Sequence, residues 1–271
     1  MKKIILIASV GLLGAFIFFC RMQKLEENKS FFAQENNLIL IHEGVDFKVR
    51  YSPCSTFKIP LALMGYDAGI LDDENSPEFP CKDEYEIFLD VWRGPHKPQS
   101  WIRNSCVWYS RIITTALGLN KFKNYIEKLN YGNQDVSGNA SLNDGLTHSW
   151  LSSSLTISAE EQIIFLQKLI KNELPVSLKA HEMTKKIMFI QELPAGWKLY
   201  GKTGNGRLLD KNGNQSALQQ GWFVGWIEKC NRTIVFVSHI LDKQKHDVFA
   251  SFRARSQALL KLHFIIDELE K

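Results

Sequence analysis

A serine and a lysine stand three residues apart in Ser55-Thr56-Phe57-Lys58, and this spacing suits nucleophilic catalysis. Three residues along a helix correspond to a rotation of about 300°, so the two side chains lie on one face, a turn apart. A base derived from Lys58 can then reach the Ser55 hydroxyl, which is a weak nucleophile until its proton is removed. At a helix start, the backbone N–H of Ser55 can also help to bind an oxyanion.

Three more short segments follow along the chain: Ser105-Cys106-Val107, Tyr131-Gly132-Asn133 and Lys202-Thr203-Gly204. A second hydroxyl can relay a proton to a leaving nitrogen. Lysine and threonine on a strand can bind a carboxylate, and glycine lets a ligand approach the backbone. Taken alone, each segment also fits a plain helix start, a glycine stop or a strand that ends in a turn. The ordered set is specific, because it is the order found in the penicillin-recognising serine enzymes.

Strands are expected near both ends of the chain, where aromatic and β-branched residues gather between turn residues. The ranges are 31–41 and 48–51, around a turn at Glu43-Gly44, and later 197–202, 220–227 and 233–241. Helices are expected from residue 55 to about 70, through most of 71–193, and over 248–270. The fold class that follows is α+β: an antiparallel sheet built from both chain ends, flanked by N- and C-terminal helices, with a helical insertion.

Two of these helices carry more specific signals. Ser158-Ala159-Glu160-Glu161 forms a capping box, which predicts a helix from Ser158 to Lys171. The last helix is amphipathic, and its buried face is expected to hold the larger apolar side chains, namely Phe252, Leu259, Leu260, Phe264 and Ile265.

The first 21 residues differ from the rest. Lys2 and Lys3 precede an apolar run over 4–19, which Arg21 closes. A basic start with a short apolar core is typical of a secretory signal, and an uncleaved anchor is the alternative. Cys20 would suit a lipoprotein signal, although the preceding residues are bulky. We therefore expect a signal peptide or N-terminal anchor at 1–21, one domain at 22–271, and an exported, periplasmic protein.

Charge and composition argue against several classes of protein. The net charge is +4, and removal of the three basic residues of the first segment would leave +1. A near-neutral protein lacks the basic footprint of a nucleic-acid binder. The five cysteines and seven histidines show neither CxxC nor HExxH spacing, so no catalytic metal is expected. Four cysteines lie beyond the first segment, which leaves free thiols or one to two disulfides open.

The four segments resemble the motifs of the class D, or oxacillinase-type, serine β-lactamases. Trp150-Leu151 and 221–226, with the sequence Gly-Trp-Phe-Val-Gly-Trp, are similar to the same family. The resemblance covers roughly Phe31 to the C-terminus, so 22–271 is expected to be a β-lactamase domain with a penicillin-binding, transpeptidase-like fold. Class A fits less well, because the chain has no S-D-N segment and no E-x-x-L-N segment to supply a glutamate base.

This resemblance implies hydrolysis of β-lactam antibiotics, and so antibiotic resistance, through an acyl-enzyme on Ser55. It implies that carbon dioxide adds to Lys58 to give an N-carboxylated lysine, the general base for acylation and deacylation, with no other cofactor. Burial would favour this addition, because it lowers the pKa of a lysine and keeps the amine neutral. Trp150 would hold the carbamate through its indole N–H. Ser105 would pass a proton toward the ring nitrogen.

The family also implies roles for residues that line the pocket. Val107 and Leu151 would contribute to an apolar wall. The substrate carboxylate would face the Lys202-Thr203-Gly204 segment and an arginine near the last helix, for which Arg253 is the first choice and Arg255 the alternative. The second oxyanion donor would be the backbone N–H of Asn205.

A small-molecule β-lactam is the partner expected of this chain. Nucleic acid and protein partners are not, and membrane contact is expected only through the first 21 residues. Two other functions remain open at this point. A penicillin-binding transpeptidase or carboxypeptidase shares the serine and lysine motifs but stays acylated. A β-lactam sensor domain would use the same modified lysine and then signal.

Overall fold

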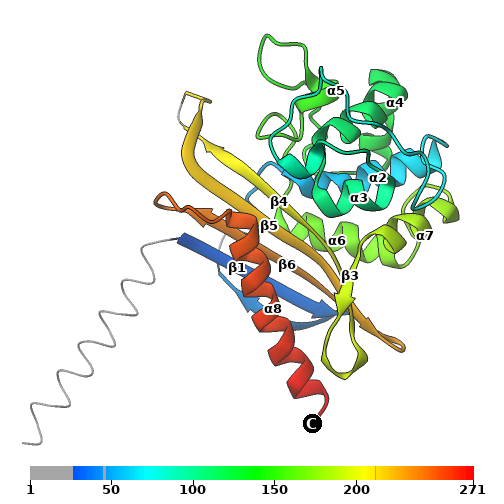
Figure 1. Ribbon diagram of the computed structural model, residues 1–271. Coiled ribbons are helices and arrows are strands. Elements are labelled where there is room, and N and C mark those ends of the chain that lie inside the picture. The colour runs from blue at the N-terminus through cyan, green and yellow to red at the C-terminus, as the bar shows by residue number, and fades with distance from the viewer. Residues whose placement is uncertain (1–26, 45–46, 211) are drawn as a thin grey trace, which may run out of the picture.

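Strands from both ends of the chain form one antiparallel sheet in the computed structural model, which describes residues 27–44, 47–210 and 212–271 (Figure 1). The proposed signal or anchor at 1–21 lies outside these residues. The sheet order is β2-β1-β6-β5-β4-β3, so β1 pairs with β6 although they are far apart in sequence. The strands are β1 (Glu27–Glu35), β2 (Leu38–Glu43), β3 (Phe189–Glu192), β4 (Lys198–Leu209), β5 (Gln215–Lys229) and β6 (Arg232–Asp242).

Helices lie on both faces of this sheet, as the α+β prediction required (Figure 1). α8 (Ala250–Leu269) packs on one face, where it contacts β5 and β6. The opposite face carries the helical insertion between β2 and β3. Its helices are α2 (Lys58–Asp67), α3 (Pro98–Asn104), α4 (Val107–Lys128), α5 (Gly145–His148), α6 (Ala159–Ile170) and α7 (Leu178–Ile187), with short 3-10 helices η1 (Cys54–Phe57) and η2 (Asp90–Trp92). A third 3-10 helix, η3 (Pro194–Gly196), connects β3 and β4.

The two faces of the sheet bury two separate apolar cores. Trp222 and Val224 of β5 belong to the core on the helical side, whereas Phe223 between them belongs to the core under α8. This alternation follows from the two-residue period of side chains along a strand. The same period in β4 directs Lys202 toward the helices, as the contacts below show, and so decides which residues of β4 face the site.

The predicted first hairpin was wrong in its boundaries. The turn falls at Asn36-Asn37, between β1 and β2, and not at Glu43-Gly44. Asn36 adopts a φ of 52°, a left-handed conformation that asparagine tolerates better than most residues. The expected strand at 48–51 is mainly irregular, with only an isolated bridge from Tyr51 to Ile157.

The capping box of α6 is confirmed, since Ser158 and Glu161 each accept from the other's backbone N–H.

The predicted buried face of α8 was confirmed for Ile265, which is buried, and for Leu259, which packs against the core, but it was wrong for the other three residues. Phe252, Leu260 and Phe264 are exposed at 55%, 75% and 58%. The face on the sheet is instead built on Ala250, Ala254, Ala258, Leu262 and Ile266. These residues recur every four positions and therefore share one face. Small side chains let the helix approach the sheet closely: a Cβ on Gly221 of β5 would lie 2.0 Å from the Ala250 carbonyl carbon.

The four described cysteines, Cys54, Cys81, Cys106 and Cys230, are all free thiols. The sequence left free thiols or disulfides open, and the structure shows free thiols at these four positions. None of the described helices is long and apolar enough to cross a membrane.

Candidate active site

The Ser55 hydroxyl lies on a short 3-10 turn, η1, which runs directly into α2. Pro53 precedes this turn, and its carbonyl accepts hydrogen bonds from the Thr56 N–H (3.1 Å) and hydroxyl (2.7 Å). Ser55 itself is only half-buried. The predicted serine–lysine pair is formed, because Lys58 Nζ donates to Ser55 Oγ at 3.3 Å.

Lys58 is a fully buried amine, with 1% of its surface exposed. Burial lowers its pKa to about 7, and the positive charge of Arg111 acts in the same direction. The cause is desolvation, which penalises the ammonium form. A lysine in this state is partly neutral near pH 7, so it can accept a proton or react as an amine.

An aromatic wall is built on Phe57, the residue that precedes this lysine. Trp150 is fully buried and stacks on Phe57, with ring centroids 5.1 Å apart. Its Nε1–H has no hydrogen-bond partner among the described residues. A buried donor without an acceptor is costly, so this indole marks a position suited to an acceptor that the side chains do not supply. The predicted wall residues Val107 and Leu151 are buried and half-buried in the same core.

Ser105 lies beside β4, within hydrogen-bond distance of Lys202. It caps the C-terminus of α3 in a left-handed conformation, with φ 55° and ψ 30°. Lys202 Nζ donates to Ser105 Oγ at 2.5 Å and to the Thr203 carbonyl at 3.0 Å and hydroxyl at 3.3 Å. The structure therefore brings together the second serine motif and the Lys202-Thr203 segment, which are about a hundred residues apart in sequence.

Lys202 is also buried, and its pKa is well below the ordinary value because of desolvation and the nearby charges of Lys58 and Arg255. Three basic groups, Lys58, Lys202 and Arg255, therefore influence one another, and none of them forms an ion pair with a carboxylate among the described residues. An anion bound beside Lys202 would favour its charged form. This is the electrostatic signature of a site for a carboxylate.

Gly204 allows β4 to press against the nucleophile turn. A Cβ at this position would lie 2.7 Å from the Pro53 carbonyl oxygen and 3.0 Å from the Thr56 nitrogen. Since real Cβ atoms almost never make a contact below 3.0 Å, any larger residue would push the strand and the turn apart. The glycine was predicted to allow a ligand to approach; in the structure it allows the close approach of the protein's own backbone.

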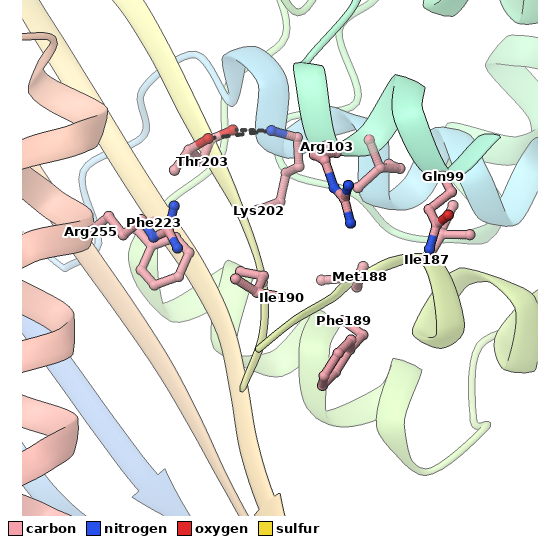
Figure 2. Close-up of a pocket in the computed structure, with 12 residues that line it drawn as sticks. Gln99, Arg103, Ile187, Met188, Phe189, Ile190, Lys202, Thr203, Phe223 and Arg255 are labelled. Atoms are coloured by element: carbon pink, nitrogen blue, oxygen red, sulfur yellow. Dashed lines mark hydrogen bonds between the residues drawn. The ribbon is translucent and has the colours of Figure 1, made fainter. Parts of the chain in front are cut away.

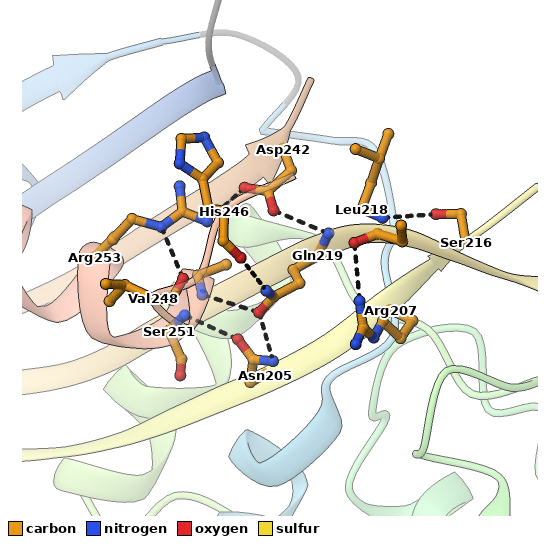
Figure 3. A network of polar contacts seen from close by, with 12 residues as sticks. Asn205, Arg207, Ser216, Leu218, Gln219, Asp242, His246, Val248, Ser251 and Arg253 are labelled. Atoms are coloured by element: carbon orange, nitrogen blue, oxygen red, sulfur yellow. Dashed lines mark hydrogen bonds and ion pairs between the residues drawn. The ribbon is translucent and has the colours of Figure 1, made fainter. Parts of the chain in front are cut away.

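The backbone N–H of Asn205 points to the same edge of β4 as that of Gly201. Gly201 N donates to Met188 O beyond that edge, and N–H groups two residues apart along a strand share an edge. The Asn205 side chain lies on the face of the sheet that carries α8. There it donates to Gln219 Oε1 (3.1 Å) and accepts from the Ser251 N–H (3.1 Å) (Figure 3). Asn205 thus ties the start of α8 to the strand that borders the site.

Arg253 does not reach this region. It binds Asp242 Oδ1 at 2.5 Å and donates to the Val248 carbonyl at 3.3 Å, at the connection between β6 and α8 (Figure 3). The alternative, Arg255, lines the cavity beside Lys202 and Thr203 (Figure 2). The two arginines lie two residues apart on a helix, so they point roughly 200° apart.

The cavity beside Lys202 and Thr203 holds about 560 Å³ of empty space that is partly open to solvent. Arg255 lies over the Phe223 ring, with its guanidinium carbon 6.0 Å from the ring centroid. Its Nε is buried and has no hydrogen-bond partner among the described residues. Ser55 and Lys58 do not line the cavity, which is linked to the serine motifs through Lys202, the donor to Ser105 Oγ.

The Tyr131-Gly132-Asn133 segment is a support for the site. The Asn133 side chain donates to the Ser154 carbonyl (2.8 Å) and accepts from the Thr156 N–H (2.9 Å). Gly132 has a φ of 58°, and a Cβ there would lie 2.1 Å from Thr156 O. The segment therefore fixes the end of α4 against the loop that follows Trp150.

Comparisons with known proteins agree with this geometry. The model of the penicillin binding protein transpeptidase domain matches residues 35–259. Beta-lactamase OXA-9 of Klebsiella pneumoniae is 43% identical over 229 residues, 82% of each chain, and Beta-lactamase OXA-1 of Escherichia coli is 42% identical over 213 residues, 78% of this chain and 74% of that protein. The crystal structure of the OXA-427 class D β-lactamase has a TM-score of 0.83 and 38% identity, covering 89% of this chain and 99% of that chain.

Proposed function

The chain belongs to the class D serine β-lactamases, and we propose from this premise how its own residues hydrolyse β-lactams. Membership follows from the domain match over 35–259 and from the identity to several curated members. The enzyme is a hydrolase that opens β-lactam antibiotics and so confers resistance. The observation that carries the assignment of roles is the buried contact between Lys58 Nζ and Ser55 Oγ.

We assign the nucleophile to Ser55. Its Oγ attacks the lactam carbonyl carbon and its proton leaves to the base at Lys58, while the carbonyl oxygen becomes an oxyanion. The C–N bond then breaks, and the ring nitrogen takes a proton from Ser105. Lys202, hydrogen-bonded to Ser105 Oγ, supplies the replacement proton. The product of this step is an ester on Ser55 that water must hydrolyse.

The backbone N–H groups of Ser55 and Asn205 form the proposed oxyanion hole. Ser55 lies in the first turn of η1, where N–H groups lack intrahelical acceptors. The Asn205 N–H points to the same edge of β4 as the Gly201 N–H, and the preceding Gly204 packs on this turn. Fixed donors of this kind stabilise a developing oxyanion without reorganising.

Lys58 fits an N-carboxylated lysine on two independent observations. Its amine is buried and partly neutral near pH 7, the form that adds carbon dioxide. The Trp150 indole is an unused donor in the same aromatic wall. When present, the carbamate supplies a general base for both half-reactions. Val107 and Leu151 belong to the apolar core on this side of the sheet, which excludes water and so favours the neutral amine.

Arg255, rather than Arg253, is the arginine that we assign to the substrate carboxylate, together with Lys202 and Thr203. Its guanidinium borders the cavity, and its buried Nε has no acceptor. Lys202 and Arg255 are both cationic donors, which match a carboxylate well. The contact would fix the ring so that its carbonyl faces Ser55.

Sustained hydrolysis of nitrocefin is the direct test of this function. The purified chain is expected to turn over many equivalents, because the base at Lys58 can activate water after acylation. The measurement is the chromogenic product formed per enzyme molecule over time. A stoichiometric burst followed by no turnover would instead indicate a transpeptidase-like or sensor-like protein.

The choice between the two arginines can be tested directly. Arg255→Ala is expected to lower kcat/KM for a penicillin by about 10- to 100-fold, since a hydrogen bond to a charged group contributes about 1.5–3 kcal/mol. Arg253→Ala is the matched variant and is expected to change stability through Asp242 more than kinetics. Steady-state kinetics and thermal melts of both variants decide the matter. The reverse pattern would restore Arg253 as the ligand.

We also propose that the enzyme is exported, with 1–21 as signal or anchor and 22–271 as the catalytic domain. The basic and apolar pattern of the first 21 residues supports this. The substrate is a small molecule, and no metal is needed in this proposed mechanism. N-terminal sequencing of the protein from a periplasmic fraction would show whether the first segment is removed.

A further inference from the structure

The hydroxyl of Ser52, three residues before the nucleophile, makes contacts to a loop a hundred residues away in sequence. Ser52 is buried, with 5% of its surface exposed. Its Oγ donates to the Trp150 carbonyl at 2.8 Å and accepts from the Ser152 N–H at 2.9 Å. The Cys54 thiol donates to it at 3.6 Å. One donor and two acceptor positions are all that a hydroxyl offers, and here all three are used.

These bonds add to other contacts between the same two parts of the chain. The Tyr51 and Ile157 backbones exchange hydrogen bonds of 3.0 and 2.8 Å. The Trp222 indole of β5 donates to the Ser52 carbonyl at 3.0 Å. Ser52 is therefore fixed from the sheet side, and through its hydroxyl it fixes the backbone on both sides of Leu151.

Trp150 depends on this support for its orientation. Its ring stacks on Phe57 and meets Phe122 edge-on, but its Nε1 has no hydrogen-bond partner among the described residues. Ring contacts are less directional than a hydrogen bond. Ser152 adds to the demand, since its φ of 53° is a left-handed conformation that the surrounding contacts must maintain. The direction of the indole N–H therefore rests on the backbone that Ser52 holds.

We propose that Ser52 is a positioning residue that acts through Trp150 to stabilise the carboxylated form of Lys58. This inference rests on the proposed carbamate. Ser52 does not touch substrate or the lysine. It fixes the Trp150 backbone, and so the indole donor whose ring stacks on Phe57, the residue before Lys58. Loss of the hydroxyl leaves the Trp150 carbonyl and the Ser152 N–H without partners in a dry region, and the loop must shift to satisfy them.

The test uses Ser52→Ala in the full chain. The bicarbonate concentration that gives half-maximal hydrolysis is expected to rise about tenfold, a typical effect of one lost buried hydrogen bond. Saturating bicarbonate is expected to restore kcat, with KM nearly unchanged. The carboxylated-lysine signal in ¹³C NMR, titrated with labelled bicarbonate, should shift in parallel. Ser52→Thr, which keeps the hydroxyl, should behave as the wild type.

Ser177→Ala is the matched control. It removes a serine hydroxyl that caps α7 by accepting from the Ala180 N–H, so it lowers stability without touching Trp150. It is expected to lower the melting temperature and leave the bicarbonate dependence unchanged. A purely structural role for Ser52 would give the same pattern as this control, and that result would overturn the inference.

Two further outcomes are distinguishable. If the wild-type enzyme gives no carboxylated-lysine signal, the proposed base is wrong and the role of Ser52 falls with it. If the wild type gives the signal and a folded Ser52→Ala variant titrates identically, only the positioning role is wrong. Should Ser52→Ala fail to fold, Ser52→Cys replaces it, since a thiol is a weaker donor and acceptor. A folded Ser52→Cys variant with wild-type bicarbonate dependence would likewise refute the proposal.

Discussion

Ser55→Ala is expected to abolish covalent labelling by a penicillin and to reduce hydrolysis by roughly 10⁴- to 10⁶-fold, as removal of a nucleophile does in other serine enzymes. The reason is that no acyl-enzyme can form without this oxygen, and Ser55 Oγ is the hydroxyl that contacts Lys58 Nζ. The fold should be unaffected, because the hydroxyl makes no contact that a helix or strand depends on. The measurement is the intact mass of the protein after exposure to penicillin.

Two other serines separate this role from general effects. Ser256 is exposed on α8, so Ser256→Ala should give the adduct in full yield. Ser105→Ala should still form the adduct, but more slowly, because the ring nitrogen loses its proton donor while the nucleophile remains. An adduct of undiminished yield on Ser55→Ala would end the assignment.

Local sequence signals predicted the parts of the site that lie on one element. The spacing of Ser55 and Lys58 determines their contact, because Ser55 lies in η1 and Lys58 begins α2 one turn later. The capping box at Ser158 determines where α6 begins. Such features need only the helical repeat, so they can be read from the chain without knowledge of its neighbours.

Features that depend on the phase of an element against a distant one could not be predicted in this way. Arg253 and Arg255 belong to the same helix, and only its rotation on the sheet decides which one faces the cavity. That rotation follows from the alanine face at Ala250, Ala254 and Ala258. We expected the larger apolar residues to be buried, and this expectation predicted the wrong rotation of the helix on the sheet. A four-residue repeat of alanines was the signal that could have corrected it.

Ser52 shows a second reason for the limit. Nothing in the sequence around it marks a function, because its partners are backbone groups of Trp150 and Ser152. A hydrogen bond to backbone carries no side-chain pattern that could pair the two segments. The apolar environment of Lys58 was foreseeable in kind from the resemblance, but the unused Trp150 indole appears only in three dimensions.

Two buried lysines, Lys58 and Lys202, have different surroundings and therefore suit different roles. Both Lys58 and Lys202 are buried, and burial lowers the pKa of each. Lys202 keeps hydrogen-bond acceptors on Ser105 and Thr203 and adjoins a cavity suited to an anion, so substrate binding can restore its charge. Lys58 has an aromatic wall and the Ser55 hydroxyl instead. Its environment therefore favours the neutral amine, from which a base can be made.

Hydrolysis is accordingly expected to depend on carbon dioxide at mildly acidic pH. The pKa of Lys58 is lowered to about 7, so the neutral amine predominates above that pH and is protonated below it. At pH 5.5 only about 3% of the amine would be neutral. The carbamate forms from the neutral amine alone, and its loss leaves an ammonium that cannot act as a base. Activity should therefore fall as the pH drops below about 7, and fall further in degassed buffer.

The decisive experiment compares steady-state hydrolysis at pH 5.5 in degassed buffer and in buffer with added bicarbonate. We expect bicarbonate to raise the rate about tenfold or more, and the carboxylated-lysine signal in ¹³C NMR to rise with it. Trp150→Ala should need more bicarbonate at every pH and should accumulate acyl-enzyme, because deacylation depends on a base that has lost its donor and gained solvent. Equal rates in the two buffers, with no carboxylated lysine detected, would show that Ser55 is activated by unmodified Lys58 instead.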